Sequence, residues 1–168
     1  MPEQIQHQAS TAAAAIKELE ALYAKFVQCA KTPSPKWKPE LGNVAVAGSG
    51  ITCYGLGCKI TATPRAVAML GSVQALEFDF VHAWEGSDSP LLRLYLQPNG
   101  WFTRDLLGQQ PFHAHDDPSI KDDLVLELCN ALLASPAFTP KPSTTAVVDT
   151  TRVVNLGASH RGRVHAVG

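Results

Sequence analysis

Residues 75–105 read ALEFDFVHAWEGSDSPLLRLYLQPNGWFTRD, and this stretch decides the fold class. In each half, apolar side chains occupy every second position: Leu76, Phe78 and Phe80, then Leu92, Leu94 and Leu96. Alternation with period two is typical of strands that bury one face. The apolar side chains of the two strands lie on the same sheet face only when the numbers of paired residues have an even sum, for example 84 and 92. Such a register predicts a connecting loop of odd length, most simply over 86–90.

A turn signal follows at Gln97-Pro98-Asn99-Gly100. A two-residue turn at this place puts Trp101 and Thr103 on the same face as the three leucines. We therefore predict a meander of three antiparallel strands with one apolar face.

Two helices are expected to frame this sheet. Over residues 3–31, apolar side chains recur at alternating steps of four and three, a spacing that places them on one helix face: Ile5, Ala9, Ala12, Ile16, Leu19, Tyr23, Phe26 and Ala30. A second helix is predicted over residues 118–134, with Asp117 as its N-cap and Pro118 as its first residue.

The segments around the meander complete an α+β domain. Three prolines predict a linker over residues 32–42, because proline cannot continue a helix. Two strands are expected over 43–53 and 56–63, whereas 65–70 fits either a helical turn or a strand. This gives an antiparallel sheet of about five strands over 43–105, within one domain over 1–135. Residues 136–168 are predicted to be an extended or partly disordered tail.

The apolar stripe of the first helix requires a partner surface. The protein's own sheet and the same helix of a second subunit both satisfy that need, and the sequence leaves both open. If the second helix covers the sheet, the stripe is available to a protein partner or a homodimer, with these candidate contacts: Ile16, Leu19, Tyr23 and Phe26. Trp37, between Lys36 and Lys38, is a further anchor candidate unless it folds back over the sheet edge.

The sharpest chemical candidate is His113-Ala114-His115-Asp116-Asp117. Histidines two apart on an extended backbone point the same way, so His113, His115 and Asp117 are candidate metal ligands. The motif resembles the HxHxD core of metallo-β-lactamase-type hydrolases, which implies metal-dependent hydrolysis. The resemblance covers five residues, and Pro118 stands where that family has its next histidine. The alternative is a loop in which Asp117 only caps the following helix.

Charge gives little support to nucleic-acid binding. Fourteen Lys and Arg against fifteen Asp and Glu give a net charge of -1, so no overall basic footprint exists. Arg93 and Arg104 are interleaved with Tyr95 and Phe102, a pattern that suits single-stranded nucleic acid. Acidic residues on the same strands favour cross-strand charge pairing instead.

The sequence predicts a cytosolic protein that does not enter a membrane. No apolar run approaches the length of a membrane helix, and the first fifteen residues lack the basic start of a secretion signal. Four cysteines are expected as free thiols, and the C-x4-C pair Cys53 and Cys58 lacks the second pair that a zinc site needs. No cofactor is predicted.

We predict a non-enzymatic, homodimeric protein-binding module, such as an adaptor, a chaperone-like protein or an inhibitor. The first alternative is a small metal-dependent hydrolase or ligand-binding protein that uses the histidine loop. The second is a nucleic-acid-binding protein that uses the sheet face and the basic tail. Enzymatic activity is left open but not favoured, since the sequence shows no catalytic residue set.

Overall fold

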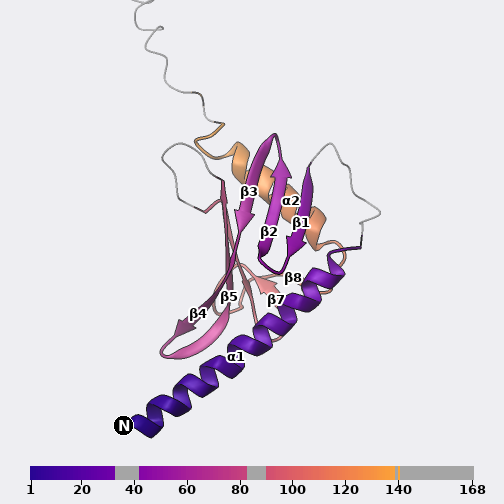
Figure 1. The fold of residues 1–168 in the computed structure, drawn as a ribbon. Coiled ribbons are helices and arrows are strands. Elements are labelled where there is room, and N and C mark those ends of the chain that lie inside the picture. The colour runs from indigo at the N-terminus through magenta and orange to yellow at the C-terminus, as the bar shows by residue number, and fades with distance from the viewer. Residues whose placement is uncertain (33–41, 83–89, 139, 141–168) are drawn as a thin grey trace, which may run out of the picture. The chain divides into compact units, whose positions relative to one another are not determined.

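The computed structural model describes residues 1–32, 42–82, 90–138 and 140. The chain divides into two compact units: residues 139–168 form the second, and residues 1–138 form the first. Its elements are α1 Pro2–Cys29, β1 Asn43–Ala47, β2 Gly50–Gly55, β3 Cys58–Ala62, β4 Pro64–Met69, β5 Ser72–His82, β6 Leu92–Leu96, β7 Trp101–Thr103, β8 Pro111–Ala114 and α2 Ile120–Leu133 (Figure 1). The predicted α+β class, an antiparallel sheet framed by two helices, is confirmed. Most of the predicted tail and most of the predicted linker lie outside the described residues.

All strand pairs are antiparallel, in the order β1-β2-β3-β5-β6-β7-β8, and β4 also pairs with β5. β3 and β4 both pair with β5 in one continuous register, in which Ile60 is opposite His82 and Pro64 is opposite Phe78. They are therefore two halves of one strand that is interrupted at Thr63. The sheet links a hairpin region at one end to the predicted meander at the other.

Within the described residues the sheet has eight strands, so the prediction of about five was too low. The expected strand over 43–53 is split by a turn at Gly48-Ser49. Residues 64–69 form a strand, which resolves that ambiguity. β8 lies beyond residue 105, where the predicted sheet ended.

The meander is present, with two changes in register. Phe80, not Trp84, lies opposite Leu92, which keeps the predicted even sum but shifts the pairing. The turn after β6 contains three residues rather than two, because Gly100 adopts φ 86° and Gln97 N–H donates to Trp101 O at 2.8 Å. One extra residue reverses the faces of the next strand. Phe102, rather than Trp101 and Thr103, therefore joins the leucine face.

The second helix begins at Ile120, two residues later than predicted. Asp117 nevertheless organises its start, since Asp117 Oδ1 accepts hydrogen bonds from Ser119 N–H at 2.9 Å and Ser119 Oγ at 2.7 Å. Near the same end, Lys121 Nζ donates to Ala30 O at 2.6 Å and Thr32 O at 2.8 Å. A cation at the carboxyl end of a helix is favourable, so α2 supplies the cap that α1 lacks in its own last turn.

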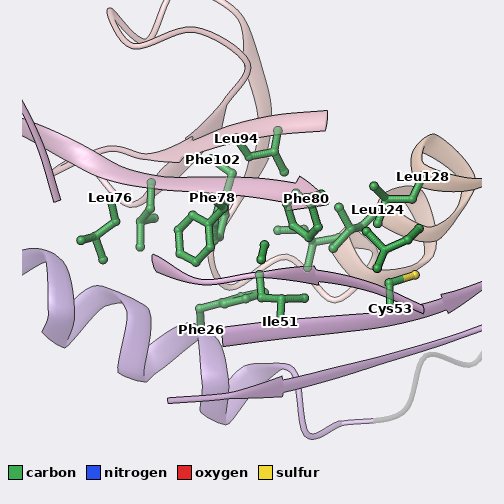
Figure 2. Close-up of a cluster of buried hydrophobic side chains, with 14 of the residues drawn as sticks. Phe26, Ile51, Cys53, Leu76, Phe78, Phe80, Leu94, Phe102, Leu124 and Leu128 are labelled. Carbon is green, nitrogen blue, oxygen red and sulfur yellow. The ribbon is translucent and has the colours of Figure 1, made fainter. Parts of the chain in front are cut away.

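Both helices bury side chains in one core. Figure 2 shows Phe78 and Phe80 of β5 directed toward Ile51 and Cys53 of β2. Leu124 and Leu128 of α2 close one end, and the C-terminal half of α1 closes the other with Leu19, Tyr23 and Phe26. Four aromatic rings meet there with neighbouring centroids 4.9–6.0 Å apart: Tyr23, Phe26, Phe78 and Phe102. Tyr23 Oη donates to Ala47 O at 2.6 Å, so the buried hydroxyl is satisfied.

Candidate functional site

α1 has two halves with different surroundings. Leu19, Tyr23 and Phe26 are at most 5% exposed, whereas residues 1–11 are all exposed and Ile5 keeps 63% of its surface in contact with solvent. The same apolar stripe thus runs out of the core and continues along a helix segment that the described sheet does not cover. Figure 1 shows this segment running past the turn between β4 and β5.

A cleft of about 310 Å³ separates this segment from the β4–β5 turn. Its helix wall is formed by His7, Ala12 and Ala15 among others, and its opposite wall by Leu70 and Val73. No charged carboxylate, ammonium or guanidinium group is among the lining residues. The cleft therefore suits an uncharged, partly apolar occupant.

Leu70 at the tip of the cleft is doubly unusual. Its side chain is fully exposed, and its backbone φ is 52°, a region that costs a leucine free energy because its Cβ crowds the following carbonyl. Leu56 occupies the same position of the β2–β3 turn with φ 51°, also followed by a glycine at positive φ. In such two-residue hairpin turns asparagine or aspartate is the usual residue before glycine.

The predicted partner contacts lie in different places. Leu19, Tyr23 and Phe26 pack in cis against the protein's own sheet, so a partner cannot reach them while α1 stays docked. Ile16 is half-buried at the border between the two halves. Trp37 lies outside the described residues. Of the predicted stripe, only the N-terminal part is left as a surface.

The structure brings two of the three predicted metal ligands, His113 and Asp117, together and directs His115 elsewhere. Asp117 Oδ2 lies 2.8 Å from Nδ1 of His113, and Asp123 Oδ2 lies 2.7 Å from Nε2, so both ring nitrogens contact a carboxylate. His115 Nδ1 lies 2.9 Å from Gly100 O. Among the residues that the structure describes, no three His, Cys, Asp or Glu side chains are grouped to hold a metal ion.

The hollow beside His113, of about 230 Å³, offers no free reactive group within the described part of the chain. Arg104 donates to both carboxylate oxygens of Glu127, at 2.7 and 2.6 Å, and its guanidinium lies 5.1 Å from the centre of the Phe112 ring. The charged groups that line it are thus paired with one another. The arrangement ties β8 and the preceding loop to α2, which is a structural role.

Asp117 gives a prediction for acid stability. Hydrogen bonds from Ser119 and then His113 lower the pKa of Asp117 from 3.8 to about 2. A lowered pKa in the folded state stabilises the protein above pH 3.8, and this contribution disappears as the pH falls toward 2. Thermal unfolding of Asp117→Asn should therefore lose less stability between pH 5 and about 2 than the wild type does. Asp116→Asn, an exposed neighbour, should follow the wild type; equal slopes for all three proteins would contradict this role.

The outer face of the meander is an ion-pair network. Glu77, whose side chain is 9% exposed, pairs with Arg65 and lies 3.8 Å from Arg93 Nε. Arg93 also donates to Asp79, with its second contact at 3.1 Å. Tyr95 is largely buried beside them, and Phe102 lies in the core. The four residues considered for nucleic-acid binding therefore have partners within the described chain.

The cysteines are poor candidates for chemistry. All four are free thiols, and Cys53 is fully buried. Burial, and then the nearby Cys129, raise the pKa of the Cys53 thiol to about 12. Burial and Cys58 likewise raise the pKa of Cys129. A raised pKa keeps thiols protonated near neutral pH, and protonated thiols are weak nucleophiles.

The residue that sequence reasoning missed is Leu70. A Leu-Gly pair between two short strands carries no functional signal, and only the hairpin register reveals the positive φ.

Neither described helix combines the length and apolarity that spanning a bilayer requires. Comparison with known protein families, with curated proteins and with solved structures gave no match.

Proposed function

We propose that this protein is a non-enzymatic protein-binding module whose docking surface is the N-terminal half of α1 together with the β4–β5 turn. One observation carries the proposal: the core stripe of α1 continues past its own sheet as an exposed apolar face beside the fully exposed Leu70. Contiguous exposed apolar surface on a protein commonly marks an interaction site.

The position of Leu70 supports the proposal. A leucine at φ 52° costs about 1 kcal/mol or more that asparagine would largely avoid. Leu56 carries the same strain, so it is the full exposure of Leu70 beside the cleft that singles this residue out. The other sites favour no catalytic alternative, because the charged groups around His113 are paired and the thiols of Cys53 and Cys129 have raised pKa values. We place the module in the cytosol, where free thiols are the expected state.

Leu70→Asn and Leu56→Asn form a matched test. Both changes relieve the same backbone strain in turns of the same kind, so each should raise the free energy of unfolding by about 1 kcal/mol. Only Leu70→Asn should weaken partner binding, by about tenfold or more, because burying a leucine contributes roughly 1.5–3 kcal/mol. The measurement is chemical crosslinking of the tagged full chain in lysate of its native host, so that weak complexes are also retained, followed by capture and mass spectrometry.

The expected result is a near-stoichiometric protein, including any untagged copy of this chain, retained by the wild type and Leu56→Asn and lost with Leu70→Asn. Equal retention by all three proteins would show that the binding surface lies elsewhere. If none of the three proteins retained a partner, the proposed binding function would be wrong.

A further inference from the structure

We propose that the occupant of this surface is a second copy of this chain, with the two α1 helices antiparallel across a two-fold axis. This inference rests on the proposed function and names its partner. It follows from the order of side chains along the N-terminal part of the stripe, where Ile5, Ala9, Ala12 and Ile16 are spaced by four, three and four residues. Ile5 and Ala9 are exposed, and Ala12 and Ile16 are half-buried.

That order is the same in both directions. An antiparallel alignment that sets Ile5 against Ile16 of the second copy also sets Ala9 against Ala12, and the reverse contacts repeat the same pairs. Large side chains meet at the two ends, and alanines meet in the middle. A two-fold interface requires a surface that is complementary to itself, and this stripe meets that condition.

The residues beside the stripe also permit self-pairing. Helix positions that flank an apolar seam normally hold the charges that select or reject a partner. Here they are Gln6, Gln8, Ala13 and Ala15, so two copies meet without like-charge repulsion. The same lack of charge gives an acidic or basic peptide nothing to recognise in this face.

The cleft adds contacts from the sheet. Ala12 belongs to the stripe and also lines the cleft opposite Leu70. A second helix on the stripe therefore lies near Leu70 and its neighbour Met69, which is 37% exposed. Since the assembly is symmetric, each copy supplies both a helix and a turn.

The size of the surface sets the expected affinity. Residues 5–16 span about 18 Å of helix, or roughly three turns. A surface this short falls below the area of stable dimers and corresponds to a transient interface. We expect dissociation constants on the order of 10 μM rather than nanomolar.

Ala9→Lys and Ala14→Lys provide the matched test. Both alanines are exposed in α1, and lysine has nearly the helix propensity of alanine, so the helix should persist in both variants. Ala9 lies on the stripe and Ala14 on the opposite side. Sedimentation velocity of the full chain over 1–200 μM, with a reductant to prevent disulfides, should show dimers for wild type and Ala14→Lys and at least about tenfold weaker dimerisation for Ala9→Lys.

Orientation is tested with Ile5→Cys and Ile16→Cys, each in a Cys29→Ser background. Antiparallel pairing predicts that a disulfide forms between the two variants when they are mixed and not within Ile5→Cys alone, whose thiols would lie about 16 Å apart. A disulfide within Ile5→Cys alone would instead indicate parallel helices and overturn the proposed geometry.

The failures can be told apart. A wild type that stays monomeric over the whole range overturns the second copy as occupant, while Leu70-dependent capture of a different protein would leave the binding function standing. If Ala9→Lys leaves dimerisation unchanged, self-association uses another surface, and the inference is overturned too.

Discussion

Replacing Phe26 with alanine is expected to lower the free energy of unfolding by about 4 kcal/mol. The Phe26 side chain is 1% exposed and fixes α1 to the sheet through an edge-on contact with Phe102, whose ring centroid is 4.9 Å away. Its removal takes away that aromatic contact and leaves a cavity that rigid strands on one side cannot fill. Urea denaturation followed by circular dichroism measures the loss.

Lys25→Ala is the matched control, because Lys25 is the exposed neighbour in the same helix turn. An exposed substitution of this kind should change stability by less than about 0.5 kcal/mol. If Phe26→Ala cost no more than Lys25→Ala, the C-terminal half of α1 would not be part of the core, and the cis packing described above would be wrong.

Gly50→Ala is expected to be the second large effect, with a loss of about 3 kcal/mol. Gly50 has φ 151°, and a Cβ at this position would lie 2.4 Å from the backbone oxygen of Ala62. Both the backbone conformation and the space require glycine, since Ala62 belongs to the strand that pairs with β2.

Gly48→Ala, two residues away in the same turn, tests the explanation. A Cβ on Gly48 would meet no atom within 4 Å. Alanine there should be neutral or stabilise by up to about 1 kcal/mol through the unfolded state. Equal destabilisation by the two substitutions in thermal melts would show that the close approach of β2 and β3 is not the cause.

The sequence was informative where side-chain alternation was strong. The leucine and phenylalanine alternation over 75–96 correctly predicted the antiparallel meander and the parity of its register, because a shift by one residue would expose the entire apolar face. The turn after Gln97 was wrong by one residue, and the face of Trp101, Phe102 and Thr103 reversed with it. Whether Gly100 adopts a positive φ depends on the neighbouring backbone, which local sequence does not specify.

The stripe of the first helix shows a different limit. Its period predicted the helix and the buried face, but the choice between cis and trans depends on how far the sheet extends beneath the helix. Leu19, Tyr23 and Phe26 lie over the sheet, and Ile5 does not, although all four fit the same pattern. Burial of a periodic apolar stripe therefore depends on how far the sheet extends beneath the helix, as well as on the spacing of the apolar residues.

The candidate site could be predicted only in part. The first-helix stripe was singled out from the sequence, but the residues named as contacts were those nearest the core. The histidine pair looked like a chelating motif because strand geometry was assumed through His115, whereas β8 ends at Ala114 and the ring of His113 is held by two aspartates. Hydrogen-bond partners ten residues away are not visible in a five-residue motif.

Amide hydrogen exchange along α1, measured at low and at high protein concentration, distinguishes the docked part of the helix from the proposed docking surface. We expect residues 19–29 to be protected at both concentrations, because they are docked on the sheet. Residues 2–16 should exchange rapidly in dilute protein and become protected, together with residues 69–72, at concentrations well above about 10 μM. Rapid exchange of residues 2–16 at every concentration, with or without a captured partner, would contradict the claim that this segment is a docking surface.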